Sequence, residues 1–202
     1  QWTAPDGMRV SGWYYPPCNP YFEWDGLPPV LVNIHGGPTS QRSLRFEPEV
    51  MYFITRGYGW LDVNYRGSSG FGRDFQQALF RRWGEADVED AVGGAQALID
   101  RGWADPTRLV IRGGSAGGYT VLNSLIRYPG LFKAGVCLYG VSDLFSLTMD
   151  SLKFELHYND WLVGDLPQAA EKYQAWSPLF HAEKIRTPLA IFQGGKDQVV
   201  PP

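Results

Sequence analysis

The chain has 202 residues, of which 44% are hydrophobic and 19% charged, and its formal net charge is −3. That length suits a single domain, and 8 Trp, 11 Tyr and 11 Phe supply side chains for a sizeable core, which excludes disordered and collagen-like chains. The weak negative charge gives no basis for binding nucleic acid or an anionic membrane, and no apolar run approaches the ~18 residues of a membrane span.

Turn residues and apolar periodicity predict the elements in chain order. Before Val30 the chain is rich in turns, and Met8–Tyr15 is expected to form an edge strand or a hairpin. From Val30 onward, short apolar runs alternate with segments of helical period, as in a parallel sheet covered by helices. The predicted strands are Val30–Ile34, Gly59–Val63, Leu109–Ile111, Ala134–Tyr139 and Leu189–Phe192, and the predicted helices are Glu47–Thr55, Asp74–Arg82, Asp87–Arg101 and Tyr119–Arg127. We therefore predict an α/β fold with a doubly wound, mostly parallel sheet and helices on both faces.

The segment 141–178 breaks this alternation. It is long for a plain connection and carries the aromatic residues Phe154, Tyr158, Trp161 and Tyr173. Long connections in compact domains are usually lids or binding loops. We predict a helical cap over one end of the sheet.

Cysteine usage and the start of the chain bear on its origin. The 2 cysteines are too few for a disulfide framework, and Cys137, inside an apolar run, is expected to be a reduced, buried thiol. This favours a reducing compartment, so we expect a cytoplasmic protein. The chain opens on Gln1 with no basic-then-apolar leader, and we expect it to be a piece of a longer protein.

The strongest motif is Gly113-Gly114-Ser115-Ala116-Gly117, which fits the pattern G-x-S-x-G. It lies between a predicted strand and a predicted helix, where a sharp turn exposes a serine hydroxyl at the carboxyl end of the sheet. Glycines flank the serine because larger side chains in this strained turn would collide with neighbouring strands. Ser115 is therefore the predicted nucleophile. The alternative, a phosphate-binding loop, is disfavoured because no G-x-x-x-x-G-K-[ST] occurs.

A serine that attacks a carbonyl needs donors for the oxyanion. The motif His35-Gly36-Gly37-Pro38 follows a predicted strand upstream of Ser115, where this kind of fold supplies one backbone N–H. The N–H of Ala116, next to the nucleophile, supplies the other. Two such donors typically contribute ~3 kcal/mol each to stabilising a transition state.

The acid of a catalytic triad follows the serine in chain order. Asp197 ends the turn Gly194-Gly195-Lys196-Asp197, just after the strand Leu189–Phe192, and a carboxylate there can orient an imidazole. Asp143, after the strand ending at Tyr139, is the second candidate. We favour Asp197 because its Gly-Gly turn suits an acid-bearing loop.

The general base is the missing member of the triad. The order of this fold requires a histidine after the acid, and the residues after Asp197 include none. Of the 3 histidines, His35 is expected to be hydrogen-bonded into the structure, and His157 and His181 are expected to be partly exposed polar residues of the cap and its exit.

Several motifs in the same order and spacing resemble the prolyl oligopeptidase family of serine peptidases, most closely its acylaminoacyl-peptidase and dipeptidyl-aminopeptidase branch. These motifs are His35-Gly36-Gly37-Pro38, Asn64-Tyr65-Arg66-Gly67-Ser68-Ser69-Gly70-Phe71-Gly72, Trp83-Gly84 with Asp87-Val88-Glu89-Asp90, Gly113-Gly114-Ser115-Ala116-Gly117-Gly118, and Gly194-Gly195-Lys196-Asp197 with Val199-Val200-Pro201. The resemblance runs from about Asp6 to the last residue.

This resemblance implies an α/β-hydrolase peptidase domain over residues 1–202, acting on short peptides without a metal or cofactor. Ser115 would match the nucleophile and Asp197 the acid, while Gly37 and Ala116 would be the oxyanion donors. Val141 and Val200 would lie near the pocket for the residue before the scissile bond. An upstream β-propeller and a downstream segment with the catalytic histidine are expected in the parent chain.

Three other expectations follow from the same residues. The 202 residues alone should be nearly inactive, because the base is missing. The strand Leu189–Phe192 should have an exposed edge that favours association of copies into a homo-oligomer. The alternatives to a peptidase are a carboxylesterase or lipase, which more often has a third glycine where Pro38 stands, and a non-catalytic hydrolase-fold module.

Overall fold

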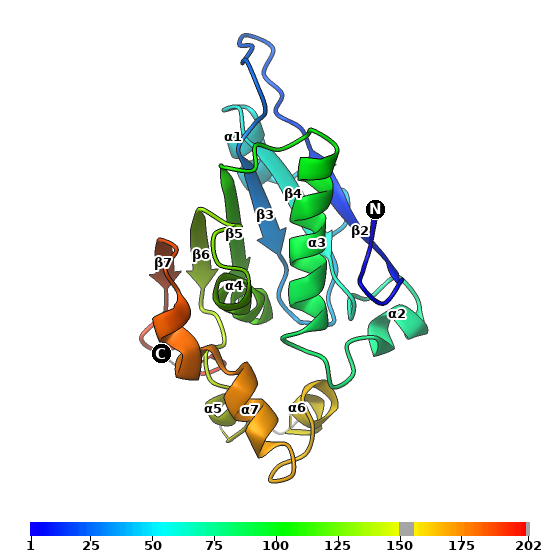
Figure 1. Cartoon of the computed structure of the whole chain (residues 1–202), viewed down its shortest axis with the longest axis vertical. Helices are drawn as coiled ribbons and strands as arrows, with labels where there is room; N and C mark the ends of the chain where they lie inside the picture. The colour runs from blue at the N-terminus through cyan, green and yellow to red at the C-terminus, as the bar shows by residue number, and fades with distance from the viewer. Residues whose placement is uncertain (150–155, 201–202) are drawn as a thin grey trace.

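The computed structural model describes residues 1–149 and 156–200 and contains a seven-stranded sheet (Figure 1). Its strands are β1 (Trp2–Thr3), β2 (Arg9–Tyr15), β3 (Val30–Ile34), β4 (Gly59–Asn64), β5 (Leu109–Gly114), β6 (Ala134–Leu138) and β7 (Leu189–Phe192), in the spatial order β1-β2-β4-β3-β5-β6-β7. β1 and β2 form an antiparallel hairpin, β2 is antiparallel to β4, and β4 to β7 run parallel. The prediction of a mostly parallel sheet with an antiparallel element at its start is confirmed.

Helices cover both faces of this sheet, as a doubly wound fold requires. The helices are α1 (Pro48–Ile54), α2 (Arg73–Gln77), α3 (Ala86–Asp100), α4 (Ala116–Arg127), α5 (Leu144–Met149), α6 (Leu156–Leu162) and α7 (Ala170–Trp176), followed by the 3-10 helix η1 (Pro178–Lys184). α3 and α4 lie side by side on one face, and α1 covers the other (Figure 1). The molecule has the α/β-hydrolase architecture predicted from the sequence.

The central strands β3 and β4 are buried over their whole length and are mainly apolar, because both of their faces are covered. In β3, Val32 and Ile34 belong to the core beneath α3 and α4. Leu31, one residue away on the opposite face, packs with Val50 and Trp60 in a second cluster under α1. The alternation of side chains along a strand thus supplies both layers of the core.

Two helix boundaries differ from the prediction by more than one residue. α2 ends at Gln77 instead of Arg82, because the backbone beyond it is bonded to the cap: Arg81 N–H donates to the Trp161 carbonyl (3.0 Å) and Trp83 N–H to the Leu162 carbonyl (3.4 Å). α4 begins at Ala116 instead of Tyr119, since its first turn contains glycines that look like helix breakers in the sequence.

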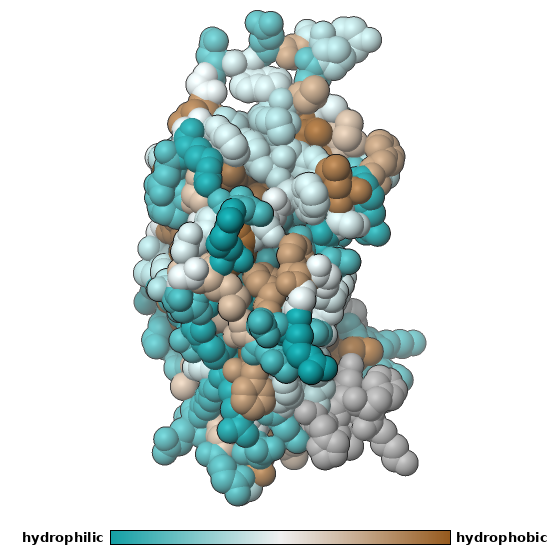
Figure 2. Space-filling model, turned by 90° about the vertical axis from the view of Figure 1, so that its right-hand side faces the viewer, coloured by the Kyte–Doolittle hydropathy of each residue, from teal (hydrophilic) through white to brown (hydrophobic). Residues whose placement is uncertain are grey.

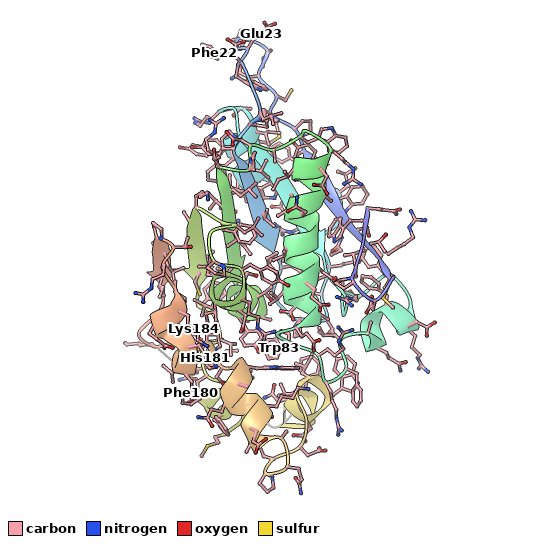
Figure 3. The ribbon with its side chains drawn as sticks, viewed as in Figure 1. Phe22, Glu23, Trp83, Phe180, His181 and Lys184 are labelled. Carbon is pink, nitrogen blue, oxygen red and sulfur yellow. The ribbon has the colours of Figure 1, made fainter. Side chains whose placement is uncertain are left out.

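The cap predicted over 141–178 is helical where the structure describes it. α5, α6 and α7 lie together beyond the carboxyl ends of the parallel strands (Figure 1). Figure 3 shows Trp83 between the start of α3 and these helices, and its indole lies 4.4 Å, centroid to centroid, from the Tyr119 ring. The Tyr119 hydroxyl also donates to the Trp176 carbonyl of α7 (3.0 Å), so the cap is bonded to the first turn of α4. Phe154, one of the aromatic residues used in the prediction, lies outside the described residues.

A buried ion cluster fastens the amino-terminal hairpin to the sheet. Arg66 is fully buried, and its guanidinium pairs with Asp90 (2.9 Å), Glu89 (2.7 Å) and Asp6. Asp6 lies in the turn between β1 and β2. A buried cation needs such partners, because its desolvation is otherwise too costly. The face around this hairpin is mainly hydrophilic, with apolar side chains in small separate groups (Figure 2).

Candidate active site

Ser115 occupies the sharp turn between β5 and α4. Its backbone has φ 55° and ψ −123°, a strained conformation for a residue with a side chain, and its N–H donates to the Leu138 carbonyl of β6 (3.0 Å). The hydroxyl does not cap α4, and the residue is partly exposed. The strand–turn–helix context that the sequence motif requires is therefore present.

The glycines of the motif are fixed by close approach. A Cβ at Gly117 would lie 2.2 Å from the Ile34 carbonyl oxygen, and a Cβ at Gly113 would lie 2.5 Å from the Gly117 oxygen. These distances are shorter than any real Cβ contact. The ends of β3 and β5 and the first turn of α4 therefore meet around Ser115 at a spacing that only glycine permits.

Two backbone segments flank the serine. A Cβ built on Gly36, in the segment after β3, would lie 3.5 Å from the Ser115 Cβ. Gly37, with φ 130°, and Ala116 line one cavity together with Ser115. As the first residue of α4, Ala116 has an N–H without an intrahelical acceptor, at the helix end that favours negative charge. The structure thus brings together the residues predicted as nucleophile and oxyanion donors.

This cavity is mainly apolar and lies under the cap. Val141 and Val200, predicted near the pocket for the residue before the scissile bond, both line it and are buried. Its other lining residues are Pro38, Trp83, Leu147, Tyr158, Asn159, Leu162 and Val199. The cavity has a volume of about 50 Å³, so a small apolar group of a substrate would be desolvated there.

The sequence analysis missed part of this lining. Trp83 was singled out only as part of a motif, and Tyr158 only as an aromatic residue of the cap. The Tyr158 hydroxyl lies 2.9 Å from Thr39 Oγ1, which joins α6 to the segment after Gly37. The available signal was the aromatic content of the cap, without any indication of which rings face the serine.

Tyr139, directly after β6, was also missed. It has φ 40° and is about half exposed, and its hydroxyl would lie 2.9 Å from a Cβ on Gly114. With Arg42, Arg112 and Ser115 it lines a polar groove on the other side of the serine. Ser115 therefore faces an apolar cavity on one side and a polar groove on the other.

His35 is built into the interior, as expected. It is 7% exposed, its ring is stacked on Tyr65 (4.4 Å between centroids), Nδ1 lies 2.7 Å from the Gly36 carbonyl and Nε2 lies 2.8 Å from Ser68 Oγ. Burial lowers the pKa of His35 to about 4. The ring is neutral near pH 7, and Nδ1 carries the proton because a carbonyl only accepts.

The two candidate acids have different surroundings. Asp197 lies in the turn after β7, where its Oδ1 accepts the N–H groups of Val199 (2.9 Å) and Val200 (3.0 Å). Asp143 Oδ1 accepts the Phe145 N–H (2.9 Å) and its Oδ2 accepts the Ser146 hydroxyl (2.7 Å). Both oxygens of Asp143 are thus used at the start of α5, and only one carboxylate oxygen of Asp197 is used by its own turn.

No histidine ring in the described structure lines the cavity of Ser115. His35 is held as above, and His181 in η1 lies against α7, with Nε2 3.1 Å from the Ala175 carbonyl (Figure 3). The side chain of His157 is outside the described residues.

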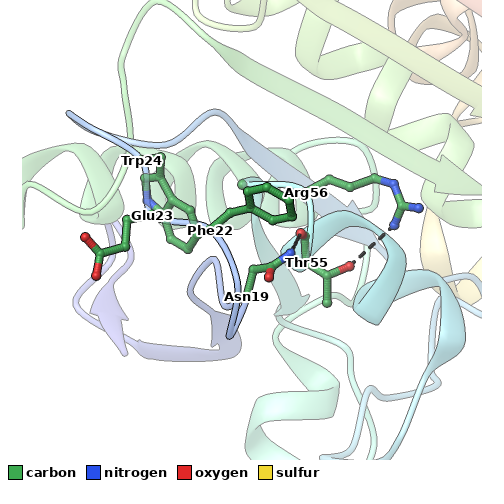
Figure 4. A pocket seen from close by; sticks show the side chains of 7 residues that line it. Asn19, Phe22, Glu23, Trp24, Thr55 and Arg56 are labelled. Carbon is green, nitrogen blue, oxygen red and sulfur yellow. Dashed lines mark hydrogen bonds between the residues drawn. The ribbon is translucent and has the colours of Figure 1, made fainter.

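The rest of the described structure offers little competing chemistry. Within residues 1–149 and 156–200, no three His, Cys, Asp or Glu side chains are grouped to hold a metal ion, and no helix has the length and apolar character to cross a membrane. A second hollow lies at the opposite end of the sheet, between the loop after β2 and the end of α1 (Figure 4). Its lining residues are Asn19, Phe22, Glu23, Trp24, Thr55, Arg56 and Gly57. Cys137 is free and buried, as predicted.

Fold and site together define the class: an α/β-hydrolase with a serine on the turn after the central strand and backbone N–H groups beside it. A model of the prolyl oligopeptidase family, Peptidase_S9, matches residues 44–202. The chain belongs to the prolyl oligopeptidase family, as the sequence motifs indicated.

Relatives agree with this assignment. The chain is 32% identical to the acylamino-acid-releasing enzyme of Arabidopsis thaliana, over 86% of the chain and 24% of that enzyme. It is 32% identical to dipeptidyl peptidase family member 6 of Caenorhabditis elegans, over 96% of the chain and 26% of that protein. A solved puromycin-hydrolyzing peptidase of Mycobacterium tuberculosis matches 100% of the chain with a TM-score of 0.96 and 45% identity, and the chain covers 31% of it. The chain thus spans less than a third of the length of these proteins.

Proposed function

We propose that the protein containing this chain is a serine peptidase that hydrolyses short peptides through an acyl-enzyme at Ser115. The observation that carries this proposal is the strained turn that holds Ser115 between β5 and α4, next to the segments of Gly37 and Ala116. That turn presents a hydroxyl, and two backbone donors beside it suit the oxyanion of a tetrahedral intermediate.

In the proposed reaction, Ser115 Oγ gives its proton to a histidine and attacks the carbonyl carbon of the scissile bond. The N–H groups of Gly37 and Ala116 donate to the oxyanion, and the amine leaves with a proton delivered by a histidine. Water then attacks the acyl-enzyme and releases the acid. Asp197 orients the histidine through Oδ2, since within the described residues the turn uses Oδ1.

The substrate class follows from the cavity and from the relatives. An apolar cavity lined by Val141 and Val200 suits an apolar residue before the scissile bond. Relatives include acylamino-acid-releasing and dipeptidyl-peptidase enzymes, so we propose release of an acylated residue or a dipeptide from short peptides. We propose that the parent chain also carries a β-propeller that limits access to such substrates.

Residues 1–202 alone are proposed to be nearly inactive. His35 and His181 are engaged elsewhere, so a base for Ser115 has to come from outside the described residues. Without it, only the residual catalysis of the oxyanion donors remains. Peptide turnover by the 202-residue chain that is lost on substituting His157 or His181 would refute this part.

The decisive experiment is labelling of the full-length protein with a fluorophosphonate, which reacts with an activated serine. Ser115→Ala should abolish labelling and hydrolysis of acyl-amino-acid amides, because no other hydroxyl occupies the turn. Labelling that persists in Ser115→Ala would defeat the proposal. Higher kcat/KM for fatty esters than for acyl-amino-acid amides would favour a carboxylesterase or lipase instead.

A further inference from the structure

The two polar groups of the peptide unit between Gly36 and Gly37, its C=O and its N–H, have different roles. Its carbonyl, that of Gly36, lies 2.7 Å from His35 Nδ1. Its N–H, that of Gly37, is the oxyanion donor of the proposed function. In a trans peptide the C=O and N–H point in opposite directions, so a bond that fixes the carbonyl also fixes the direction of the N–H.

We infer that His35 is a positioning residue: its Nδ1–H holds the Gly36 carbonyl and thereby aims the Gly37 N–H away from the ring, toward the cavity of Ser115. The inference rests on the proposed function. It assigns His35 neither proton transfer nor contact with substrate. Its whole effect passes through one peptide plane.

The ring is itself held in place by the segment after β4. Tyr65 stacks on it with an interplanar angle of 17°, and the Tyr65 hydroxyl donates to the His35 carbonyl (3.1 Å). Ser68 Oγ lies 2.8 Å from Nε2 and 2.6 Å from the Tyr65 carbonyl, and its single proton can serve either acceptor. The stacked Tyr65 ring and the bond at Nδ1 therefore hold the imidazole, and Ser68 Oγ lies beside Nε2.

The same segment also holds the chain beyond the donor. The Arg42 N–H donates to Asn64 Oδ1 (2.7 Å), and Asn64 Nδ2 donates back to the Arg42 carbonyl (3.0 Å). The Ser69 N–H donates to the Ser40 carbonyl (2.9 Å). Residues 64–69 thus fix the conformation of residues 35–42 through these contacts. The His35 ring is the contact nearest to the Gly37 N–H.

The protonation state of His35 fits this role. A neutral ring has one N–H, and the Gly36 carbonyl requires it at Nδ1, which leaves Nε2 as an acceptor facing Ser68. The low pKa of about 4 keeps this state over the range in which peptidases are assayed. A buried histidine that only filled space would not need to present a proton at this position.

The test compares two substitutions in the full-length protein. His35→Asn places an amide N–H near the position of Nδ1 and retains the bond to Gly36. His35→Gln reaches toward Ser68 instead and loses that bond. Because a misplaced oxyanion donor acts on the transition state, we expect kcat of His35→Gln to fall about 100-fold with KM nearly unchanged, and kcat of His35→Asn to fall less than about fivefold.

A second measurement separates positioning from a structural role. A peptide trifluoromethyl ketone forms a tetrahedral adduct with the serine and needs the oxyanion donors, whereas a product peptide does not. His35→Gln should weaken inhibition by the ketone in proportion to kcat and leave inhibition by the product unchanged. The same pair of substitutions at His181 is the matched control and should change kcat less than about twofold, because its ring lies beside Ala175 of α7 and Lys184 of η1, away from the cavity of Ser115.

The outcomes are distinguishable. If Ser115→Ala retains activity, the proposed function is wrong and the positioning role falls with it. If Ser115→Ala is inactive but His35→Asn and His35→Gln have equal kcat, or lose only KM, the positioning role alone is overturned. If circular dichroism shows the His35 variants unfolded, Tyr65→Phe decides: it keeps the stacked ring, and an unchanged kcat instead of a roughly fivefold loss would overturn the inference.

Discussion

Ser115 and Asp197 both follow parallel strands of one sheet, yet their surroundings differ. Around Ser115, three backbone segments approach so closely that Gly113 and Gly117 admit no side chain. Around Asp197, Gly194 and Gly195 have room for a Cβ, and the preceding strand β7 exposes Ile191 (62%) and Phe192 (60%). Within the described residues, β7 pairs only with β6. The backbone that carries the nucleophile is closely packed, whereas the acid follows β7, the edge strand of the described sheet.

This difference shows that the residues of one site can be positioned in two ways, by packing of the core and by a local turn. The position of Ser115 is a property of the core, so it can change only together with β3, β5 and α4. The position of Asp197 is set by a local turn, in which Oδ1 accepts two N–H groups. Substitutions on the first side should therefore change stability, and those on the second side should change activity alone.

The largest effect is expected for Asp197→Asn in the full-length protein. The amide oxygen retains the bonds to the Val199 and Val200 N–H groups, so the melting temperature should be preserved. The charge that orients the histidine is lost, and kcat should fall by about 10⁴-fold. Steady-state kinetics and thermal melts on the same preparation measure both.

Asp143→Asn is the matched control for this prediction. Asparagine still caps α5 through the Phe145 N–H, so kcat should change less than about twofold. If Asp143→Asn shows the larger loss of kcat, the second candidate acid is the true one and the contrast between interior and edge does not describe the site.

The next largest effect is expected from adding one methyl group beside Ser115 and one beside Asp197, by Gly117→Ala and Gly195→Ala. Gly117→Ala forces a Cβ to within 2.2 Å of the Ile34 oxygen, and overpacking of this severity should lower the free energy of unfolding by about 3 kcal/mol or more. The gain of ~1 kcal/mol in helix propensity is too small to offset it. Gly195→Ala, with no neighbour within 4 Å, should change it by less than ~0.5 kcal/mol. Urea denaturation curves of the two variants should therefore differ clearly, and similar midpoints would contradict the comparison.

The difference in free energy of unfolding between wild type and His35→Asn should change by about 3 kcal/mol with pH. The reason is that the pKa of His35 falls from an unperturbed 6.5 to about 4 on burial. Between these values the unfolded chain binds a proton that the folded chain does not. The free energy of unfolding therefore decreases as the pH falls from 6.5, until both states are protonated below about pH 4.

Asp90, whose pKa burial raises to about 6, titrates in both proteins and cancels when they are subtracted. Urea titrations at a series of pH values give this difference. If the difference in free energy of unfolding between the two proteins does not vary with pH, the pKa of His35 is the same in the folded and unfolded states and the prediction is wrong.

Much of the fold was predictable because its signals are local. β3 and β7 have the predicted bounds, since a short apolar run between turn residues identifies a strand. The end of α2 was not predictable, because the backbone of Arg81 and Trp83 bonds to cap residues that are distant in the sequence. The early start of α4 was not predictable, because Gly117 has a low helix propensity and the close approach of the Ile34 carbonyl that requires glycine there cannot be read from the sequence.

For the candidate site, motif order located Ser115 and the segment of Gly37, and the structure brings them into one cavity. The positions of Tyr139 and Tyr158 beside them could not be predicted, since they depend on how β6 ends and how the cap folds back. His35 was expected to be hydrogen-bonded, but its partner Ser68 could not be identified from the sequence. Motifs of neighbouring residues could be interpreted from the sequence, and contacts between residues on different strands could not.

The backbone conformation of Ser115 has a consequence for engineering. A non-glycine residue at φ 55° and ψ −123° stores of the order of 1–3 kcal/mol of strain, which glycine would relieve. A library screened only for heat resistance would therefore enrich glycine at this position and discard the hydroxyl. Selection for a more stable protein therefore has to include a test for reaction with a serine-directed probe, because stability and reactivity depend on the same pair of dihedral angles.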